Sequence, residues 1–364
     1  MALIFTAILV ALVFTYINGF HDTANSIATV VSTKVLSPRQ AVVLAAFTNL
    51  LGALWGTAVA KTIASGLVDP RIVTSEIIVC ALLGAIVWNL LTWWFGLPSS
   101  SSHALVGGLS GACLAAANNN WGVLVWSIPG KEHWWDGKGL LWKVFVPMIT
   151  SPILGLTVGF VVMGSLYFLL RNWRPVTVNR VFGKLQLFSA AYMGFSHGTN
   201  DAQKTMGIIA LALAAATAAG TFAPIPDWLH FLKIPAPEAG KSLDIPAWIK
   251  VICAMTMCAG TAAGGWRIIK TLGHKMVKLH PVHGFAAEAT GASVLVVAAH
   301  FGMPVSTTHA ITTSIMGVGC AKGFNALKLK VVKRILWAWV LTIPASGLVA
   351  YCLVRVARSL GWLS

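Results

Sequence analysis

Long apolar stretches separated by short polar loops dominate the pattern of this chain. A helix that crosses a membrane needs about 20 mostly apolar residues. Seven stretches approach that length and predict spanning helices: 2–17, 40–60, 73–95, 143–170, 246–264, 284–301 and 335–354. Three further stretches are apolar but interrupted: 98–117 and 304–321 each follow a Gly-x-Pro, and 185–220 contains a polar segment at 196–204. The pattern predicts an all-α polytopic membrane protein with about 10 to 12 membrane segments.

The composition supports the same class. Of the 364 residues, 57% are hydrophobic and 10% are charged, whereas about 25% are charged in soluble proteins. The net charge is +16, from 26 Lys and Arg against 10 Asp and Glu. A nucleic-acid-binding protein shares that sign but not this hydrophobicity. We therefore expect a multi-pass protein of the cell (inner) membrane that contacts lipid and binds no nucleic acid.

Two short motifs each occur twice, in the order one, two, one, two. The first reads NGFHDTAN at 18–25 and HGTNDAQK at 197–204. The second reads PSSSSHA at 98–104 and PVSTTHA at 304–310. Two matched pairs in register indicate an internal duplication. They divide the chain into a first repeat, 1–170, and a second repeat, 171–364.

The basic residues predict how the two repeats are oriented. Dense clusters lie at 171–184, 267–278 and 322–334, whereas the loops 118–138 and 221–245 are close to neutral. The positive-inside rule places the dense clusters in the cytoplasm. If each Gly-x-Pro segment forms a re-entrant hairpin with the preceding helix, the repeats have opposite orientations and both termini are extracytoplasmic. The sequence thus predicts two inverted-topology repeats, with broken helices around a site near the midplane.

Four acidic residues lie in or beside apolar segments: Asp22, Glu76, Asp201 and Glu288. An ionisable group at such a position is costly and usually functional. Asp22 and Asp201 occupy matching positions in the repeats, which favours a functional role. The alternative is that each aspartate pairs with a basic neighbour such as Lys204 and locks helices together. Glu76 is interpreted as a residue at a helix entrance near the interface, and for Glu288 both interpretations stay open.

The Pro-Ser/Thr segments predict an anion site. Proline suits the first turn of a helix, and the next residues expose backbone N–H groups at the positive end of the helix dipole. Hydroxyl groups add donors at Ser100, Ser101, Ser102, Ser306, Thr307 and Thr308. Two such helix starts, related by inverted symmetry, would hold one oxyanion from opposite sides. The alternative is ordinary capping of interrupted helices, which uses the same residue types.

A coupling partner is expected because carboxylates and an oxyanion in one dry pocket repel each other. Protons on the carboxylates or bound cations must therefore enter with the substrate. Asn18, Asn25 and Asn200 offer neutral oxygen ligands for a cation. Lys204 stands where the first repeat has Asn25 and adds a positive charge to the second repeat. This asymmetry favours protons over a second cation.

Histidines accompany both motifs at positions 21, 103, 197 and 309. A histidine can relay protons near neutral pH, but we expect neutral imidazoles that bond to the backbone. A further cluster, His274, His280 and His283, lacks metal-ligand spacing and is interpreted as part of the cytoplasmic face.

These motifs resemble those of the inorganic phosphate transporter (Pit) family. The family's first hallmark, Gly-x-Asn/His-Asp-x-x-Asn/Lys, is matched at 19–25 and 198–204. Its second hallmark, Pro-x-Ser-x-x-His-Ala, is matched at Pro98 and Pro304. The resemblance covers 15–355. It implies a secondary active transporter that imports inorganic phosphate by alternating access, forms a homodimer, and is neither an enzyme nor dependent on a cofactor.

The resemblance and the residues together give two candidate sets. The substrate-binding set is Asp22, Asn25, Ser100, Ser101, Ser102, Asp201, Lys204, Ser306, Thr307 and Thr308. The coupling-ion set is Asn18, Asp22, Asn200, Asp201 and Glu288, of which the first four would bind Na⁺ if sodium drives transport. No resident metal is expected.

Within the family, the motifs are most similar to the bacterial low-affinity branch, which is coupled to H⁺. Those carriers are linked to neutral complexes of phosphate with Mg²⁺ or another divalent cation. Lys204 departs from the Na⁺-coupled pattern, and the counterpart of Glu288 falls near Lys61. The alternatives are a Na⁺-coupled phosphate symporter or a sulfate permease of the same family. An anion channel is a different class, against which the paired acids argue because they repel anions.

Overall fold

The structure, a computed structural model, describes residues 1–65, 67–69, 71–130, 137–222, 225–235 and 243–362. This part of the chain is helical, with two isolated β-bridges and no strand. The helices are α1 (Ala2–Ser32), α2 (Pro38–Ala53), α3 (Ala58–Ser65), α4 (Ser75–Trp94), α5 (Ser101–Ala116), α6 (Val146–Leu169), α7 (Pro175–Ala218), α8 (Ala247–Ala263), α9 (Trp266–Lys270), α10 (Pro281–His300), α11 (Thr307–Lys322) and α12 (Leu329–Ser359). The predicted all-α class is confirmed.

Five helices in the described ranges are long and apolar enough to cross a membrane. They are α1, α4, α6 with its preceding turn, α10 and α12. Two bent pairs raise the number to seven if each pair is one span: α2 with α3, bent by 68°, and α8 with α9, bent by 57°. The stretches 40–60 and 246–264, expected as single spanning helices, are therefore each broken by a bend. The expected 10 to 12 segments also counted the short hairpin helices, and that number stays a prediction.

The helices that carry the first motif run without a break. α1 has 31 residues and α7 has 44, and both pass straight through their motifs. The polar segment at 196–204 interrupts the apolar stretch but not the helix, because it lies inside α7. A Cβ on Gly198 would lie 2.2 Å from the carbonyl oxygen of Asn49 in α2, and a Cβ on Gly19 would lie 2.7 Å from that of Met257 in α8. The motif glycines allow close helix contact.

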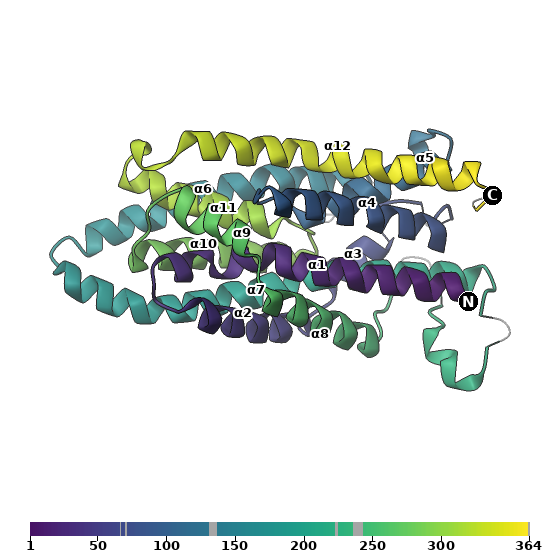
Figure 1. Cartoon of the computed structure of the whole chain (residues 1–364), viewed down its shortest axis with the longest axis horizontal. Helices are drawn as coiled ribbons and strands as arrows, with labels where there is room; N and C mark the ends of the chain where they lie inside the picture. Colours follow the sequence, from purple (N-terminus) through teal and green to yellow (C-terminus); the bar gives the residue numbers. More distant parts are fainter. Residues whose placement is uncertain (66, 70, 131–136, 223–224, 236–242, 363–364) are drawn as a thin grey trace.

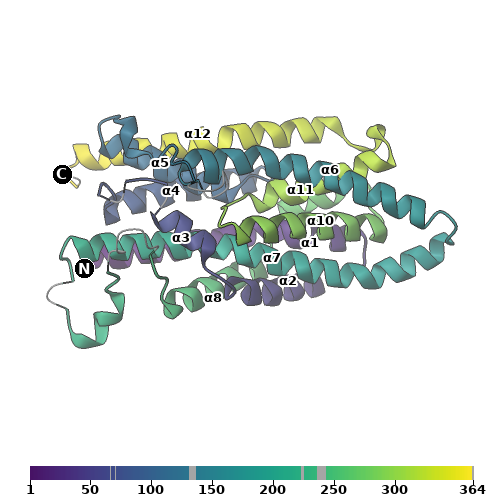
Figure 2. The same ribbon diagram turned by 180° about the vertical axis from the view of Figure 1, so that it is seen from behind.

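The Gly-x-Pro segments form the turns of two helical hairpins. α4 packs against α5, and α10 packs against α11. Gly96 and Gly302 occupy the two turns with φ of +64° and +61°, a conformation that glycine adopts at no steric cost. Figures 1 and 2 show the two hairpins in opposite halves of the bundle. Their tips meet, since the hydroxyl of Ser102 donates a hydrogen bond to the carbonyl oxygen of Val305 at 3.2 Å.

Helices of one predicted repeat pack against helices of the other, in what we call exchanged pairs. α1 packs on α8 and α2 on α7, while α5 packs on α12 and α6 on α11. Each of these pairs joins one helix from 1–170 with one from 171–364. The predicted repeats are therefore intertwined, with the site between them.

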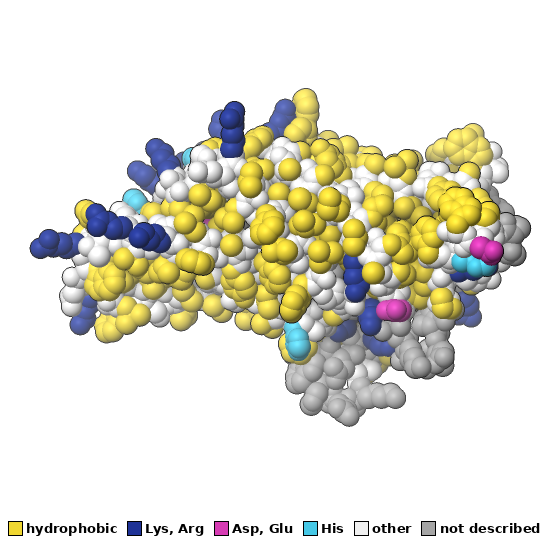
Figure 3. Space-filling model, turned by 90° about the horizontal axis from the view of Figure 1, so that it is seen from below, with side chains coloured by type: hydrophobic (Ala, Val, Ile, Leu, Met, Phe, Trp, Pro, Cys, Tyr) yellow, Lys and Arg dark blue, Asp and Glu magenta, His cyan; other side chains and the backbone are white. Residues whose placement is uncertain are grey.

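The two ends of the bundle differ in charge. Both termini lie at one end (Figure 1). Lys and Arg side chains gather at the other end (Figure 3), where α6 connects to α7 and α11 to α12. A broad apolar surface lies between the two ends, as expected for a protein whose sides face lipid. The termini thus share one side, as expected, and which side is extracytoplasmic stays a prediction.

Candidate functional site

The two motif helices and the two hairpin tips meet in the interior. All ten residues of the predicted substrate-binding set are 3% exposed or less. α1 and α7 supply the aspartates, the asparagine and the lysine, and the starts of α5 and α11 supply the hydroxyl groups. The structure thus encloses the predicted set at one place between four helices.

Lys204 links α7 to both hairpin tips. Its ammonium donates hydrogen bonds to the Asp201 carboxylate, to the Ser102 hydroxyl, and to the carbonyl oxygen of Val305 at 3.2 Å. Lys204 and Asp201 are each 1% exposed. The alternative in which an aspartate pairs with Lys204 is therefore observed for Asp201. An ion pair without water is strong only when its remaining donors are satisfied, and Lys204 meets that condition.

Two hydroxyl groups of α11 bridge the aspartates. Thr307 donates to the Asp201 carboxylate at 3.0 Å, and Thr308 donates to the Asp22 carboxylate at 3.2 Å. The Asn25 side-chain amide donates to both threonine hydroxyls, at 3.2 and 3.0 Å. The network therefore runs from one motif helix to the other through the first turn of α11.

Two histidines extend the network. The Nδ1 atom of His21 lies 2.8 Å from the Asp22 carboxylate, and its Nε2 atom lies 3.2 Å from the Thr92 hydroxyl. The Nε2 atom of His197 lies 3.1 Å from the Asp201 carboxylate, and its Nδ1 atom lies 3.0 Å from the side-chain oxygen of Asn49. The expectation that these imidazoles bond to the backbone is wrong, because carboxylates on the same helix are closer.

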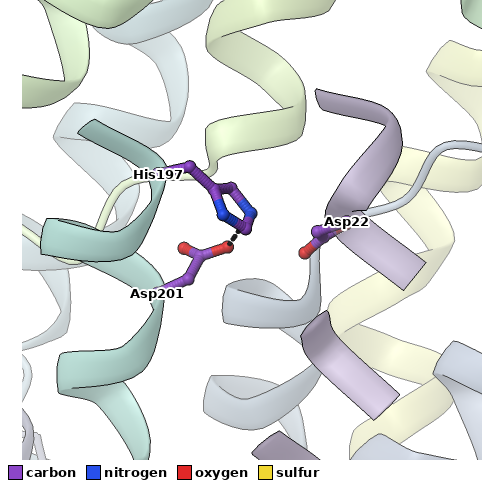
Figure 4. Close-up of side chains that lie close together, drawn as sticks. All are labelled: Asp22, His197 and Asp201. Atoms are coloured by element: carbon purple, nitrogen blue, oxygen red, sulfur yellow. Dashed lines mark ion pairs between the residues drawn. The ribbon is translucent and has the colours of Figure 1, made fainter. Parts of the chain in front are cut away.

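His197 faces both carboxylates. Figure 4 shows its imidazole next to Asp201 and directed toward Asp22. One potential ligand atom from each of these three residues lies within 4.8 Å of the others, and all three are buried. Carboxylate oxygens and imidazole nitrogens are ligands that divalent metals use. The three residues could hold a divalent cation after a small inward movement.

The first serine of each hairpin helix is a cap. The Ser100 hydroxyl accepts from the backbone N–H of His103 at 3.2 Å, and the Ser306 hydroxyl accepts from that of His309 at 3.1 Å. The capping interpretation therefore describes Ser100 and Ser306. The buried hydroxyl of Ser101 has no hydrogen-bond partner among the described residues.

Several buried amide groups near the motifs are also unpaired. Both polar atoms of the Asn18 and Asn200 side chains, and the Asn25 side-chain oxygen, have no partner among the described residues. Asn18 and Asn200 are 0% exposed. Buried polar groups are nearly always hydrogen-bonded, so their concentration in the two motifs marks a place where a polar ligand gains partners.

Glu288 belongs to a separate cluster. Its carboxylate accepts hydrogen bonds from Thr29 at 2.5 Å, from Gln186 at 3.1 Å, and from Ser189. Thr29 follows Asp22 by seven residues on α1, which is about 10 Å along a helix. The structure therefore does not bring Glu288 into contact with the other predicted coupling-ion residues. Glu76 lies in the first turn of α4 and is half-buried, in agreement with a helix entrance.

The counterpart of Glu288 in the first repeat stays a prediction. Lys61, near which the sequence placed it, lies in α3.

Sequence reasoning missed three polar residues beside the site. Asn49 bonds His197, and its side-chain amide also donates to Thr261 at 3.0 Å. Thr92 bonds His21. Trp339 stacks on the ring of His309, with 3.8 Å between ring centroids. Asn49 and Thr92 could have been found in the sequence, because each is a polar residue inside an apolar stretch. No sequence feature pointed to Trp339.

Comparison with known proteins gives one consistent result. Residues 18–350 match the family described as the Phosphate transporter family. The chain is similar to a "Probable low-affinity inorganic phosphate transporter" of Bacillus subtilis (strain 168), with 42% identity over 361 residues that cover 97% of this chain and 98% of the relative. A protein of the same description from Rhizobium meliloti (strain 1021) is 42% identical over 344 residues, 94% of this chain and 93% of the relative.

A solved structure shares the fold. It is titled "The sodium-dependent phosphate transporter" and superimposes with a TM-score of 0.80, covering 98% of this chain and 99% of its own. The sequence identity is 22%, so this likeness concerns the architecture.

Proposed function

The chain belongs to the Phosphate transporter family, and we propose that it imports inorganic phosphate together with protons by alternating access. It is a multi-pass membrane transporter and not an enzyme. The observation that supports the proposed site is the set of unpaired buried amides and the Ser101 hydroxyl beside two carboxylates. A tetrahedral oxyanion would accept hydrogen bonds from the amide nitrogens of Asn18 and Asn200 and from the Ser101 hydroxyl.

The proposed binding step exchanges partners within the network. In the enclosed state, Lys204, Thr307 and Thr308 donate to the two aspartates. Phosphate oxygens would replace the carboxylates as acceptors for these donors. Charge-assisted hydrogen bonds from an ammonium to a phosphate are strong, so the exchange preserves the interactions of Lys204.

The negative charge of the two aspartates must then be neutralised. Asp22 and Asp201 lie close to the same site, and a phosphate between them adds negative charge. Protonation removes the repulsion and turns each carboxyl group into a donor. We therefore propose that Asp22 and Asp201 carry the coupled protons, with Glu288 as a further proton or ion site on the path.

Sodium coupling is the second candidate for the coupling ion. Asn18 and Asp22 on α1 would supply oxygen ligands, and Asn200 and Asp201 on α7 would supply the matching ones. Lys204 disfavours a sodium ion at Asp201, because its ammonium already neutralises that carboxylate. A sulfate permease is the remaining alternative for the substrate, because serine and threonine hydroxyls bind either oxyanion.

A divalent cation fits the same proposal as part of the substrate. Asp22, His197 and Asp201 offer one ligand atom each within 4.8 Å. A complex of phosphate with Mg²⁺ or another divalent cation would be neutral, which lessens the repulsion in the pocket. Such a cation would travel with phosphate.

The proposed architecture completes the mechanism. We infer that 1–170 and 171–364 are inverted repeats, because their helices pack in exchanged pairs and their hairpins enter from opposite ends. The termini are proposed to be extracytoplasmic, since they lie opposite the basic end. A homodimer in the inner membrane is part of the proposal through the resemblance of the motifs.

Uptake of radiolabelled phosphate into proteoliposomes tests the coupling. Separate pH and Na⁺ gradients would be applied, with Mg²⁺ present or absent and sulfate as competitor. We expect uptake that follows the pH gradient and is insensitive to Na⁺. A requirement for Na⁺ would overturn proton coupling, and better uptake of sulfate would overturn the substrate. Large single-molecule currents in bilayer recordings would indicate a channel.

The aspartates are tested in the same assay. We expect Asp22→Asn and Asp201→Asn each to abolish accumulation while the protein still inserts in the membrane. Asp227→Asn is the matched control, because its side chain is fully exposed in the loop after α7. Normal uptake by either site variant would remove that aspartate from the mechanism.

A further inference from the structure

A second pocket lies at the basic end of the bundle, away from the transport site. It occupies about 410 Å³ between the end of α6, the start of α7, the start of α10 and the last residue of α11. Its lining combines two kinds of residue. Basic and polar side chains come from Arg171, His280, His283 and Lys322, and apolar walls come from residues such as Met163.

The charge of this pocket is of one sign. No aspartate or glutamate lines it. Arg171 and Lys322 are exposed, and neither has an ion-pair partner among the residues that the structure describes. The Arg171 guanidinium lies over the ring of Phe168, 4.7 Å from its centroid, which leaves its N–H edge available to an acceptor. The pocket therefore suits an anion.

A fixed hydrogen-bond chain adds a neutral donor. The buried His283 ring accepts at Nδ1 from the backbone N–H of His280, at 2.9 Å. Because a backbone N–H can only donate, the ring proton of neutral His283 must lie on Nε2. That atom lies 2.8 Å from the Tyr167 hydroxyl and donates to it. The phenolic hydrogen of Tyr167 is thereby left for another acceptor.

Apolar side chains form much of the pocket wall. Met163, Leu170, Val178 and Val282 line it beside the basic residues. Elsewhere on α6, Val161, Phe168 and Leu169 are 61%, 65% and 67% exposed. Trp173, also in the lining, is 48% exposed, and tryptophan is enriched where membrane meets water. A free phosphate ion would leave these apolar walls unused.

We propose that this pocket binds the headgroup phosphate of an anionic phospholipid. Arg171 and Lys322 would contact the phosphate, Tyr167 would donate a hydrogen bond to it, and the acyl chains would lie along α6. Basic pockets between helix ends on the positively charged side of a membrane protein are suited to anionic lipid. The bound lipid would join α6 to α10, which lie on opposite sides of the proposed repeat boundary.

The test measures the melting temperature of the purified full chain in neutral detergent. Short-chain phosphatidylglycerol is titrated, with phosphatidylcholine of equal chain length and inorganic phosphate as parallel arms. We expect phosphatidylglycerol to raise the melting temperature. Each basic residue contributes about fivefold in affinity, so Arg171→Gln with Lys322→Gln should shift the midpoint concentration about 25-fold upward. Tyr167→Phe, which removes one oxygen atom, should shift it about tenfold.

A matched pair of variants separates the pocket from general surface charge. Arg180→Gln with Lys333→Gln removes two exposed charges at the same end without touching the lining. We expect its midpoint to stay within about twofold of the original chain. The proposal is overturned if this pair weakens binding as much as the pocket pair, or if phosphatidylcholine acts equally well. A stabilisation by inorganic phosphate that the pocket pair abolishes would instead assign the pocket to free phosphate.

Discussion

Replacing Lys204 with methionine isolates the energy of the buried ion pair. The substitution keeps an unbranched apolar side chain, one atom shorter, and removes the ammonium, which donates to Asp201, Ser102 and Val305. The Asp201 carboxylate, 1% exposed, is then left without its cation. Breaking one side of a buried pair costs about 3–5 kcal/mol. At about 2 °C per kcal/mol, the melting temperature should fall by about 6–10 °C.

The second substitution in the cycle is Asp201→Asn. Alone, it leaves the Lys204 ammonium buried against a neutral amide and should also destabilise. In the double variant no unpaired charge is buried, so we expect a coupling energy of about 2–3 kcal/mol and a melting temperature above that of Lys204→Met alone. Intrinsic tryptophan fluorescence of the detergent-solubilised protein gives all four melting temperatures.

A control and a clear refutation complete this experiment. Lys330→Met removes an exposed lysine at the basic end of α12 and should change the melting temperature by no more than about 1 °C. If the double variant shows only the sum of the two single effects, the ion pair does not contribute as the geometry requires. The account of Lys204 as the link between α7 and the hairpin tips would then be wrong.

Three other predictions concern separate parts of the chain. Gly198→Ala should lower the melting temperature by several degrees, because the added Cβ would lie 2.2 Å from the α2 backbone. Gly183→Ala is the control on the same helix: its added Cβ would have no neighbouring atom within 4 Å, so the change should be neutral or slightly stabilising. Glu288→Gln should destabilise by about 1–3 kcal/mol in a denaturation assay, since an amide nitrogen would face groups that donate to the carboxylate. The hydrogen bonds from Arg71 lower the pKa of Asp69 below its ordinary 3.8, so the stabilisation is present above that value and lost as pH falls through the lowered pKa. Asp69→Asn should therefore flatten the acid limb of a melting-temperature profile, and an unchanged limb would contradict this.

The helices and the meeting of the motifs were predictable from the sequence. Apolar length alone locates α4, α6, α10 and α12, because a bilayer requires such stretches. The duplication places Asp22 and Asp201 at matching positions, and the structure brings them to one site. The basic clusters at 171–184 and 322–334 correctly indicate that these two connections lie at the same end of the bundle.

The path of the motif helices was not predictable in the same way. Gly19 and Gly198 lie in polar segments, and a glycine there can break a helix or allow close packing. Only the neighbouring α8 and α2 decide between these outcomes, and they are distant in sequence. The role of a hydroxyl depends likewise on its direction: Ser100 caps a helix, whereas Ser102 bonds the opposite hairpin.

The exchanged helix pairs have a consequence for how the protein is made. When synthesis reaches the end of α6, its contact face has no partner, because Gly159 packs against α11, which is made much later. α1 and α5 already contact α4, but their faces toward α8 and α12 stay uncovered until those helices are made. During synthesis, α1, α5 and α6 therefore expose small-residue faces to lipid until α8, α12 and α11 have inserted. A gene divided after codon 170 would therefore yield two fragments that each need the other present to mature.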